Sequence, residues 1–129
     1  MSRIGMIDWS RMITPETARR FANEWIDAWN RHDLNAILAH YAEGITFASP
    51  FAVKLLGAPD GVVVGVSALR AYFEKGLAAY PDLHFSLHHV AVGVGSVTLI
   101  YTSVKGLLAA ETMFLDEQLK VVRAVAHYE

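Results

Sequence analysis

One acidic residue lies inside an otherwise uncharged segment and could act as an acid or a base. Glu111 belongs to the run AAETMFL, in which every other side chain is neutral. If its carboxyl faces an apolar interior, desolvation raises its pKa, and it becomes a general acid, a general base or a donor that orients a ligand. The alternative is a carboxylate at a sheet edge, paired with Lys105 or Arg123. Strand alternation places Glu111, Met113 and Leu115 on one face.

Ser49 is a second polar residue, at a point where the chain is expected to turn. It follows the apolar run ITFA and precedes Pro50. A serine nucleophile needs a histidine or lysine within hydrogen-bond reach, and no neighbour in the sequence suggests one. The alternative is that the Ser49 hydroxyl caps or closes the turn at Pro50.

Six histidines raise the question of a metal site. His88 and His89 are adjacent on a predicted strand and should point to opposite faces, while His84 and His88 share a face about 13 Å apart, at roughly 3.3 Å per residue. Zinc ligands each lie about 2 Å from the metal, so no local pair can chelate, and we predict no metal site. A site built from His88, His127 and Glu111 stays an alternative. If one histidine shuttles protons in a cavity, His88 is the first candidate, but the pattern favours the alternative of a hydrogen-bonded interface histidine.

The first half of the chain is predicted to form three helices. The first begins at Thr14 and Pro15, because the hydroxyl accepts from an early N–H and proline fits the first helical position. Asp33 caps a second, short helix, and Ser67 caps a third, which Pro81 stops. Apolar residues recur at helical spacing in each. They are Ala18, Phe21, Ala22, Trp25, Ile26 and Trp29 in the first helix, Leu34, Ile37, Leu38 and Tyr41 in the second, and Leu69, Tyr72, Phe73, Leu77 and Tyr80 in the third.

Strands dominate the second half. A short strand at 45–48 ends before Pro50, the segment GAPDG forms a turn, and VVV after it is a short strand at most. Four longer strands follow in an antiparallel meander, at 83–92, 97–105, 108–115 and 120–128. Helices followed by a sheet indicate the α+β class. The facing of the second of these four strands stays open, since Tyr101 with Ser103 and Ile100 with Thr102 are equally good inward sets.

Charge is missing from the centre of this predicted sheet. Residues 85–104 contain no Asp, Glu, Lys or Arg, so neither face of these strands has the charged alternation of a sheet half open to water. The three helices can cover one face. A second copy of the same sheet can cover the other, which predicts a homodimer.

Length and composition exclude several classes of protein. The 129 residues fit one domain, which we place at residues 14–129 after an extension at 1–13. The formal charge of −2 and the lack of a basic run give no footprint for nucleic acid. The absence of cysteine removes disulfides and thiolate chemistry. The opening segment carries Asp8 and Arg11, which is not typical of a signal peptide, so we expect a cytoplasmic protein with no membrane partner.

Three groups of residues follow the pattern of one superfamily. They are Trp29, Asn30, His32, Asp33, Leu34, Ile37, Tyr41, Ala42, Glu43, Phe47, Ser49 and Pro50; then Gly65, Ala68, Leu69, Tyr72 and Phe73; and finally Asp116, Glu117, Lys120, Val121 and Val122. From about residue 15 to 128 the chain resembles the nuclear transport factor 2-like superfamily, in its SnoaL-like and ketosteroid isomerase-like branches. The resemblance implies a cone-shaped α+β barrel, in which a strongly curved mixed or antiparallel sheet wraps around three helices. It leaves the activity open, because this fold hosts isomerases, cyclases, dehydratases, hydrolases and binding domains.

The ketosteroid isomerase pattern also marks what this chain lacks. The resemblance places a carboxylate base at Ser49 and the phenol of an oxyanion hole at Trp25, so both groups are replaced here. A serine hydroxyl without assistance is too weak a base to abstract a proton next to a carbonyl. The indole N–H of Trp25 can still donate to a ligand, with a packed tryptophan as the alternative. Glu111 falls where these isomerases keep a second, protonated acid.

The predicted interior is a cavity for a small, mostly apolar molecule with a few polar anchors. Its expected lining is Trp25, Trp29, Tyr41, Phe47, Ser49, Tyr72, Phe73, Tyr101, Glu111 and Tyr128. Three functions stay open, and none of them calls for a cofactor. The first is an isomerase, cyclase or dehydratase that uses Glu111 with help from a tyrosine or histidine. The second is a ligand-binding domain without chemistry, and the third is a dimeric structural domain whose rings fill its own interior.

Overall fold

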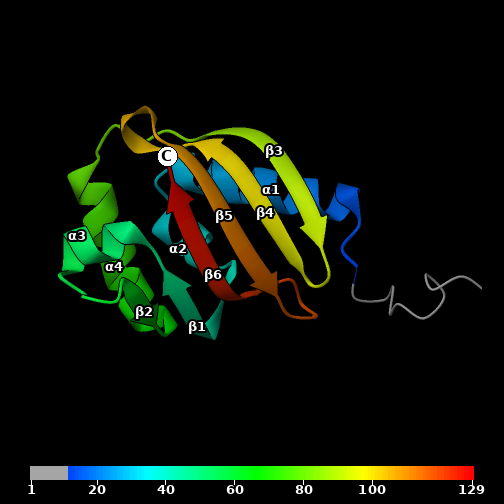
Figure 1. Ribbon diagram of the computed structural model, residues 1–129, viewed down its shortest axis with the longest axis horizontal. Coiled ribbons are helices and arrows are strands. Elements are labelled where there is room, and N and C mark those ends of the chain that lie inside the picture. Colours follow the sequence, from blue (N-terminus) through cyan, green and yellow to red (C-terminus); the bar gives the residue numbers. More distant parts are fainter. Residues whose placement is uncertain (1–11) are drawn as a thin grey trace, which may run out of the picture.

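A computed structural model describes residues 12–129 of the chain (Figure 1). The predicted extension at 1–13 lies almost wholly outside these described residues. The elements are α1 (Pro15–Asn30), α2 (Leu34–Leu38), β1 (Tyr41–Ala48), α3 (Pro50–Leu56), β2 (Val62–Val64), α4 (Val66–Ala79), β3 (Ser86–Gly93), β4 (Ser96–Thr102), the short 3₁₀ helix η3 (Val104–Gly106), β5 (Leu108–Leu115) and β6 (Val121–Tyr128). No helix within residues 12–129 is long and apolar enough to cross a membrane.

The six strands form one mixed sheet in the order β2-β1-β6-β5-β4-β3. β1 and β6 run parallel, and the other neighbouring strands pair antiparallel. Figure 1 shows α1 and α2 behind one face of the sheet, with the strands in front. The predicted α+β class is confirmed. The sheet is not closed into a barrel, since β2 and β3 form two separate edges.

The first helix begins and ends on side-chain hydrogen bonds. The Thr14 hydroxyl accepts from the backbone N–H of Thr17 at 3.1 Å, and Pro15 takes the first helical position, as predicted. At the other end, Asn30 Nδ2 donates to the carbonyl of Phe85 at 2.9 Å, and the N–H of Phe85 donates to Asn30 Oδ1 at 2.7 Å. This pair of hydrogen bonds ties the end of α1 to the segment before β3, which brings Phe85 into the core.

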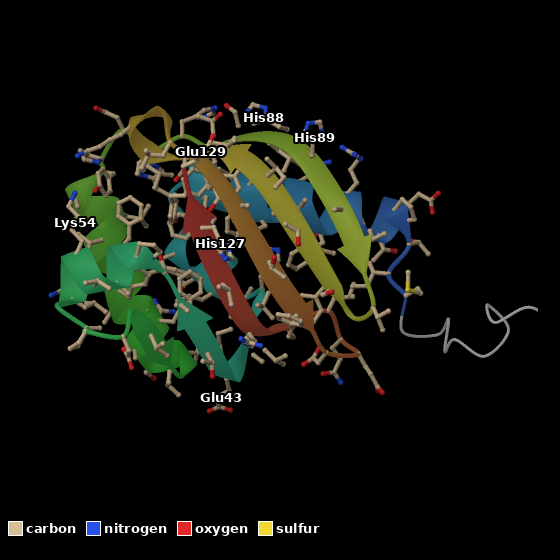
Figure 2. All side chains as sticks on the ribbon, in the orientation of Figure 1. Glu43, Lys54, His88, His89, His127 and Glu129 are labelled. Atoms are coloured by element: carbon tan, nitrogen blue, oxygen red, sulfur yellow. The ribbon has the colours of Figure 1, made fainter. Side chains whose placement is uncertain are left out.

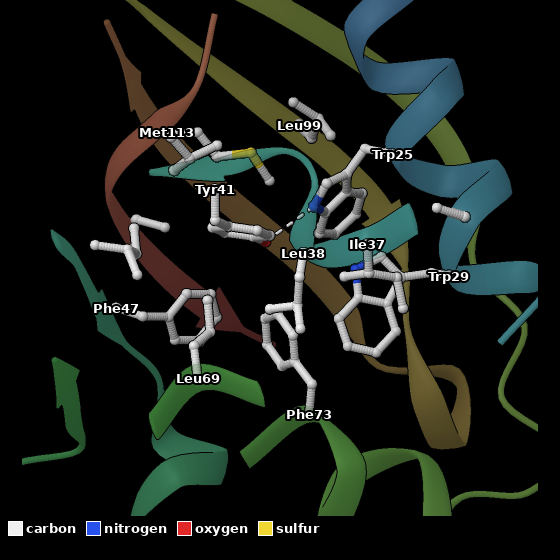
Figure 3. Packing of buried hydrophobic residues seen from close by; sticks show 14 of the residues in the cluster. Trp25, Trp29, Ile37, Leu38, Tyr41, Phe47, Leu69, Phe73, Leu99 and Met113 are labelled. Carbon is white, nitrogen blue, oxygen red and sulfur yellow. Dashed lines mark hydrogen bonds between the residues drawn. The ribbon is translucent and has the colours of Figure 1, made fainter. Parts of the chain in front are cut away.

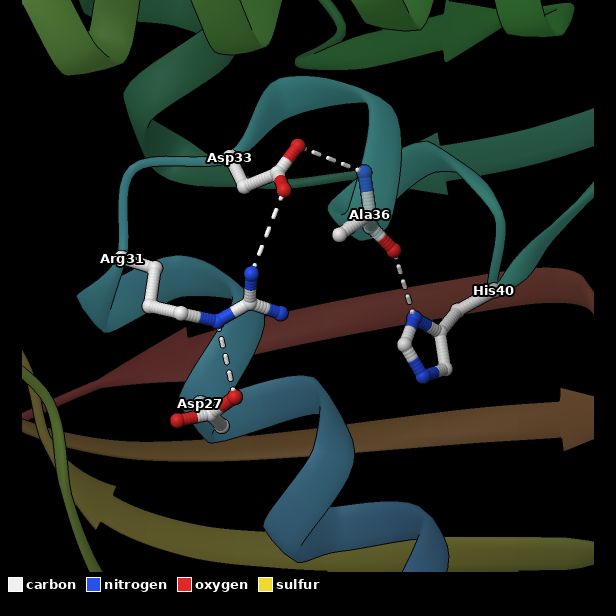
Figure 4. Close-up of polar contacts among 5 residues, drawn as sticks. All are labelled: Asp27, Arg31, Asp33, Ala36 and His40. Carbon is white, nitrogen blue, oxygen red and sulfur yellow. Dashed lines mark hydrogen bonds and ion pairs between the residues drawn. The ribbon is translucent and has the colours of Figure 1, made fainter.

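The junction between α1 and α2 is held by short-range polar contacts (Figure 4). Asp33 caps α2 as predicted, because its Oδ1 accepts from the N–H of Ala36 at 3.1 Å. Arg31 pairs with Asp27 at 2.9 Å and with Asp33 at 3.2 Å, and His40 Nδ1 contacts the Ala36 carbonyl at 3.0 Å. The ion pairs are largely exposed and contribute little to stability, whereas the cap is worth about 1 kcal/mol.

Two local predictions about helices are wrong. Tyr41 does not belong to the second helix but begins β1, where its ring is buried. Ser67 does not cap the third predicted helix, because α4 begins one residue earlier, at Val66. Gly65 is the capping residue, with a φ of 88° that glycine adopts readily, and its N–H donates to the Ile45 carbonyl at 2.7 Å.

The chain also has a fourth helix that the sequence analysis missed. α3 follows β1 directly and has its own boundary signals. Pro50 lies in the first turn of α3. Gly57 ends the helix with a φ of 67°, in the left-handed conformation typical of a helix C-terminus. These signals were present in the sequence but were assigned to a turn. α3 contributes two residues to the cavity described below.

A bulge in β3 changes the facing of two histidines. The register with β4 shifts between Leu87 and His89, so that Leu87 pairs with Tyr101 and His89 pairs with Ile100. His88 and His89 are therefore both exposed, instead of alternating between the two faces as predicted. The reason is that the extra residue of a bulge breaks the strand period of two.

The outer face of the sheet contains threonines and apolar side chains in its centre. Thr98 and Thr112 share a hydrogen bond of 2.9 Å between their hydroxyls, and Arg123 lies over the ring of Phe114 at 5.3 Å from its centroid. Among the described residues, the helices lie on the opposite face (Figure 1). The pairing of two such faces in a homodimer stays a prediction.

The open question about β4 is answered by its burial. Val97, Leu99 and Tyr101 are buried, while the residues between them are half-buried. Ser103, just past the strand, is buried as well, so Tyr101 and Ser103 form the inward set. The core lies between this face and the helices, with Trp25, Trp29, Tyr41, Phe47 and Phe73 in one aromatic cluster (Figure 3).

Candidate active site in an aromatic cavity

A cavity opens between the inner face of the sheet and the helices α1, α3 and α4. Its volume is about 60 Å³, less than half of the roughly 150 Å³ of an engineered protein cavity that binds benzene. The structure brings together all the predicted lining residues except Ser49. The lining consists of Trp25, Trp29, Tyr41, Phe47, Phe51, Leu55, Tyr72, Phe73, Gly76, Tyr80, Leu83, Phe85, Tyr101, Ser103, Val104, Glu111 and Tyr128. Most of the interior is therefore filled by the protein's own rings, and only a few ligand atoms fit without movement.

Glu111 faces this cavity from the middle of β5. Ala109, Glu111, Met113 and Leu115 are all buried, which confirms the predicted face and excludes the exposed ion pair with Lys105 or Arg123. The residue is only 2% exposed. Glu111 Oε1 accepts a hydrogen bond of 2.8 Å from the phenol of Tyr101, and Oε2 has no hydrogen-bond partner within residues 12–129. The site thus presents one carboxyl oxygen that is available to a ligand.

The register of three strands explains why Tyr101 reaches Glu111. Tyr101 of β4 and Tyr128 of β6 both pair with Ala109 of β5, which lies two residues before Glu111 and on the same face of the sheet. The small side chain of Ala109 leaves room for the two neighbouring tyrosine rings, and Tyr101 contacts Glu111 as a diagonal neighbour. Sheet pairing therefore assembles the acid and its phenol donor.

Burial changes the acidity of the groups in this cavity. Desolvation raises the pKa of Glu111 to about 7, although the hydrogen bond from Tyr101 lowers it in part. Near neutral pH, this carboxyl therefore exists in both protonation states and can give or take a proton. Burial, and next the charge of Glu111, raise the pKa of Tyr101 and Tyr41 well above the ordinary tyrosine value. Both phenols stay protonated and can act as donors.

The two cavity tryptophans have different roles. Trp25 Nε1 donates to the hydroxyl of Tyr41 at 3.0 Å, in a fully buried bond (Figure 3). The indole of Trp25 is thus a packed donor within the core, and not the donor to a ligand that we considered. Trp29 Nε1 is buried and has no partner among the described residues. Trp29 is the tryptophan with a free donor, which the sequence analysis did not distinguish.

Ser49 lies beside the cavity as a helix cap. Its hydroxyl accepts from the N–H of Phe51 at 3.2 Å at the start of α3, which confirms the capping alternative. It also lies near the phenols of Tyr72 and Tyr128, since it lowers the pKa of both. Desolvation nevertheless dominates and raises the pKa of Tyr72 to about 12.

Removal of this cap should have a moderate cost. We expect Ser49→Ala to lower the free energy of unfolding by about 1 kcal/mol, because the start of α3 loses its side-chain acceptor. Urea denaturation followed by circular dichroism measures the change. Ser67→Ala is the matched control, since the exposed Ser67 makes no capping bond in α4, and it should stay within about 0.5 kcal/mol of the parent. Equal losses in both variants would contradict the assigned role of Ser49.

The histidines lie away from the cavity. His88 is exposed on the outer side of β3, where its Nε2 contacts the Thr102 hydroxyl at 2.6 Å, so the prediction that it lies in the cavity is wrong. Figure 2 shows His88 and His89 beside β3 and His127 on the exposed side of β6. His127 pairs with Ala110, one residue from the inward Glu111, so these two side chains point to opposite faces. Over residues 12–129, no three His, Asp or Glu side chains lie close enough to hold a metal ion.

Several lining residues escaped the sequence analysis. Phe51 and Leu55 belong to α3, and capping signals would have revealed their helix. The sequence predicts a strand over Leu83 and Phe85, but both residues precede β3 and are buried, and the ring of Phe85 packs against Trp25 and Trp29 of α1. His32 Nε2 contacts the carbonyl of Leu83 at 2.8 Å, next to the Asn30 contact with Phe85. No local pattern in the sequence indicates these contacts, which join residues about 50 positions apart.

Comparison with known proteins places this geometry among related folds. The family model described as "SnoaL-like domain" matches residues 22–128. A SnoaL-like protein of unknown function from Burkholderia thailandensis E264 is similar in structure with a TM-score of 0.88 and 44% sequence identity, over 92% of this chain and 98% of that chain. No curated protein matches the sequence.

More distant structures share the fold alone. SalBIII, an epoxide hydrolase/cyclase-like enzyme in pyran ring formation in the polyether salinomycin, has a TM-score of 0.72 and 17% identity, over 88% of this chain and 92% of that chain. A candidate ketosteroid isomerase from Kribbella flavida DSM 17836 has a TM-score of 0.69 and 15% identity, over 88% of this chain and 78% of that chain.

Proposed function

The chain belongs to the family of SnoaL-like domains, and on that premise we propose that it converts a small, mostly apolar molecule in the aromatic cavity without a cofactor, with Glu111 as acid or base. The observation that carries this proposal is the buried carboxyl of Glu111, whose Oε2 finds no partner in the described part of the chain and faces a cavity lined by aromatic rings. A structural carboxyl would be expected to have both oxygens hydrogen-bonded, because an unsatisfied buried group costs free energy.

The reaction class follows from the single carboxyl. As a carboxylate, Glu111 can take a proton from a carbon or hydroxyl of the substrate, and as an acid it can return that proton at another position. This sequence conserves electrons and needs no second reactant, so it suits an isomerisation, a ring closure or the elimination of water. Tyr101 keeps the carboxyl oriented through its 2.8 Å hydrogen bond. Trp29 Nε1 can donate to the oxygen at which negative charge develops.

The structural neighbours support an enzyme of the isomerase, cyclase or dehydratase type in general, and they leave its substrate open. The distant structural neighbours include an epoxide hydrolase/cyclase-like enzyme and a candidate ketosteroid isomerase. Both are activities that one or two carboxyl groups can catalyse. Their low identities limit the argument to the fold, so the choice between isomerase, cyclase and dehydratase stays a proposal.

A non-catalytic ligand-binding domain is the second candidate. The observation that favours it is the capping role of Ser49, since the resemblance to ketosteroid isomerases places a carboxylate base at this position. The lining of the cavity then has one carboxyl group, Glu111 with its raised pKa, and no second carboxylate to act as a base. Binding without proton transfer separates this candidate from the first.

The cavity can be blocked from one position on α4. Gly76 lines the cavity, and a Cβ built there would meet no atom within 4 Å. Gly76→Leu should therefore fold, gain about 0.8–1 kcal/mol of helix propensity, and place its side chain in the cavity mouth. We expect this variant to lower ligand binding and turnover at least about tenfold, because the enclosed space is only about 60 Å³.

Exchange of carbon-bound hydrogen for deuterium measures proton transfer directly. A panel of small cyclic enones and β-hydroxy ketones is incubated with the protein in D₂O and followed by proton NMR. Ala78→Leu is the matched control, since Ala78 is exposed on α4 and does not line the cavity. Exchange by the parent and Ala78→Leu, but not by Gly76→Leu, supports the enzyme. Shifts of the Trp29 indole signal without exchange support the binding domain, and neither response overturns both.

A further inference from the structure

The cavity beside Glu111 is too small to hold a whole metabolite, but it borders a larger groove with which it shares lining residues. The groove has a volume of about 480 Å³, compared with about 60 Å³ for the cavity. The two share four lining residues at the mouth, which are Tyr80, Leu83, Ser103 and Val104. A substrate that places a few atoms beside Glu111 must therefore extend its remaining atoms into this groove.

The groove differs from the cavity in chemistry. The cavity is aromatic, whereas the groove adds the polar side chains of Asp82, His84, Thr102 and Lys105. Among the described residues of its lining, Lys105 is the one lysine or arginine. The ion pairs within residues 12–129 join Arg31 to Asp27 and Asp33, so Lys105 has no direct ion-pair partner there. Its ammonium is available to an anionic group.

The backbone at Lys105 is unfavourable for a lysine. Residues 104–107 form a tight turn closed by a hydrogen bond of 3.1 Å from the Leu107 N–H to the Val104 carbonyl. Its two central residues, Lys105 and Gly106, both have positive φ angles, of 57° and 71°. Asparagine, aspartate or glycine is preferred at the first central position of such a turn, and a residue with a large side chain costs about 1–2 kcal/mol in this conformation.

The side chain of Lys105 is directed towards the mouth shared by the groove and the cavity. Its Nζ lies 5.9 Å from the ring centroid of Tyr80, one of the four shared residues. A cation over an aromatic face is attracted to it by about 0.5–1 kcal/mol at an exposed site. This contact holds the ammonium where a ligand leaving the cavity would pass. Tyr80, Asp82 and His84 are the other titratable groups that line the groove.

We propose that the groove is a second subsite, in which Lys105 binds the anionic end of a carboxylate-bearing substrate whose neutral, apolar end enters the cavity. This inference rests on the proposed function, because it assigns the substrate class of the same site. Strained backbone at a ligand contact is a recurrent feature of functional sites. A carboxylate on the ammonium forms a charge-assisted hydrogen bond, which is stronger than one to a neutral amide.

Matched acids and amides test this subsite. The probes are butanoate, hexanoate and octanoate, and the corresponding primary amides, titrated at about pH 6, where a carboxyl of pKa about 7 is largely protonated and does not repel the acids. Protein NMR gives dissociation constants, with the Trp29 indole signal as the reporter of cavity entry. We expect the parent to bind at least the longer acids about five- to tenfold more tightly than the amides.

Variants of the turn separate charge from stability. Lys105→Gln should remove the preference for acids and leave amide binding unchanged, whereas Lys105→Arg should keep it. Lys105→Asn should also remove the preference while the protein becomes at least as stable as the parent, since asparagine suits a positive φ. Lys75→Gln is the matched control, because Lys75 is exposed on α4 and lines neither the cavity nor the groove.

The outcomes distinguish this inference from the proposed function. Amides that shift the Trp29 signal, together with acids that bind no better, overturn the subsite and leave the cavity proposal standing. Tighter binding of hexylamine than of hexanoate would assign the groove to a cation beside Asp82, and would also overturn it. No binding of any probe overturns both proposals. An acid preference that persists in Lys105→Gln assigns it to another group and rejects Lys105.

Discussion

Replacement of Glu111 by glutamine should lower the rate of proton exchange, for any substrate that the parent converts, by about 100-fold or more. A general acid or base contributes about 10²–10⁴ to the rate, and an amide can neither take nor give the proton. Glutamine preserves the shape of the side chain and can still accept the hydrogen bond from Tyr101, so the loss measures chemistry rather than packing. The D₂O exchange assay gives the rates.

The pH profile tests the same role independently. Because burial raises the pKa of Glu111 to about 7, the parent rate should rise through about pH 7 if Glu111 acts as a base, and fall through it if Glu111 acts as an acid. Glu43→Gln is the control, since Glu43 is exposed on β1 and should leave both rate and profile unchanged. A Glu111→Gln variant with more than about a third of the parent rate would exclude Glu111 from catalysis.

The same carboxyl should make folding stability depend on pH. The pKa of Glu111 is about 7 in the folded protein and about 4.3 in the unfolded chain. Between these values the folded state holds a proton that the unfolded state releases, so the free energy of unfolding falls as pH rises from about 4 to 7. The stabilisation by this group is complete below about pH 4 and lost above about pH 7. The expected difference is about 4 kcal/mol.

Glu111→Gln should remove this dependence, because the amide does not titrate. At about pH 8 the variant should therefore be more stable than the parent, by up to about 4 kcal/mol, while at about pH 4 the two should be similar. Urea denaturation at several pH values measures both curves, and Glu43→Gln corrects for general effects of charge. Parallel curves for the parent and Glu111→Gln would show that the carboxyl is not desolvated.

A protein that is destabilised by its own acid at neutral pH has a feature that packing alone does not explain. A buried methionine or glutamine at position 111 would avoid the cost of ionisation, and Met113 already occupies the same face of β5. The unpartnered Oε2 adds to this cost, since the group has lost water without full compensation. Strained or costly groups of this kind concentrate at functional sites, which connects the expected loss of stability with the proposed chemistry.

The size of the cavity restricts the substrate more than its chemistry does. Rings such as Trp25, Phe85 and Tyr101 pack against one another with centroids 4.9 to 5.8 Å apart. They fill most of the interior that the sequence analysis assigned to a ligand. The space that stays open is about 60 Å³ and has Glu111 in its lining, so under our proposals the reacting end of a substrate is small and the groove at Lys105 binds the remainder.

Local rules determined a large part of this protein from the sequence alone. Capping by Thr14 and Asp33, the apolar stripe of α1 and the shared face of Glu111, Met113 and Leu115 follow from residues two to four positions apart, and the structure confirms them. That this shared face is the inward one was left open by the sequence. The α+β class follows from the change of period along the chain. The same rules also specified α3, through Ser49, Pro50 and Gly57, but these signals were assigned to a turn.

Only the tertiary structure decided which groups meet. The Tyr101–Glu111 bond depends on strand register, the exposure of His88 on a bulge, and the burial of Phe85 on a contact with Asn30 55 positions away. Trp29, and not Trp25, has the free indole N–H, because Trp25 donates to the phenol of Tyr41 while no acceptor among the described residues lies within reach of Trp29 Nε1. These outcomes are set by long-range packing, and a one-residue change in register would alter them without changing any local pattern.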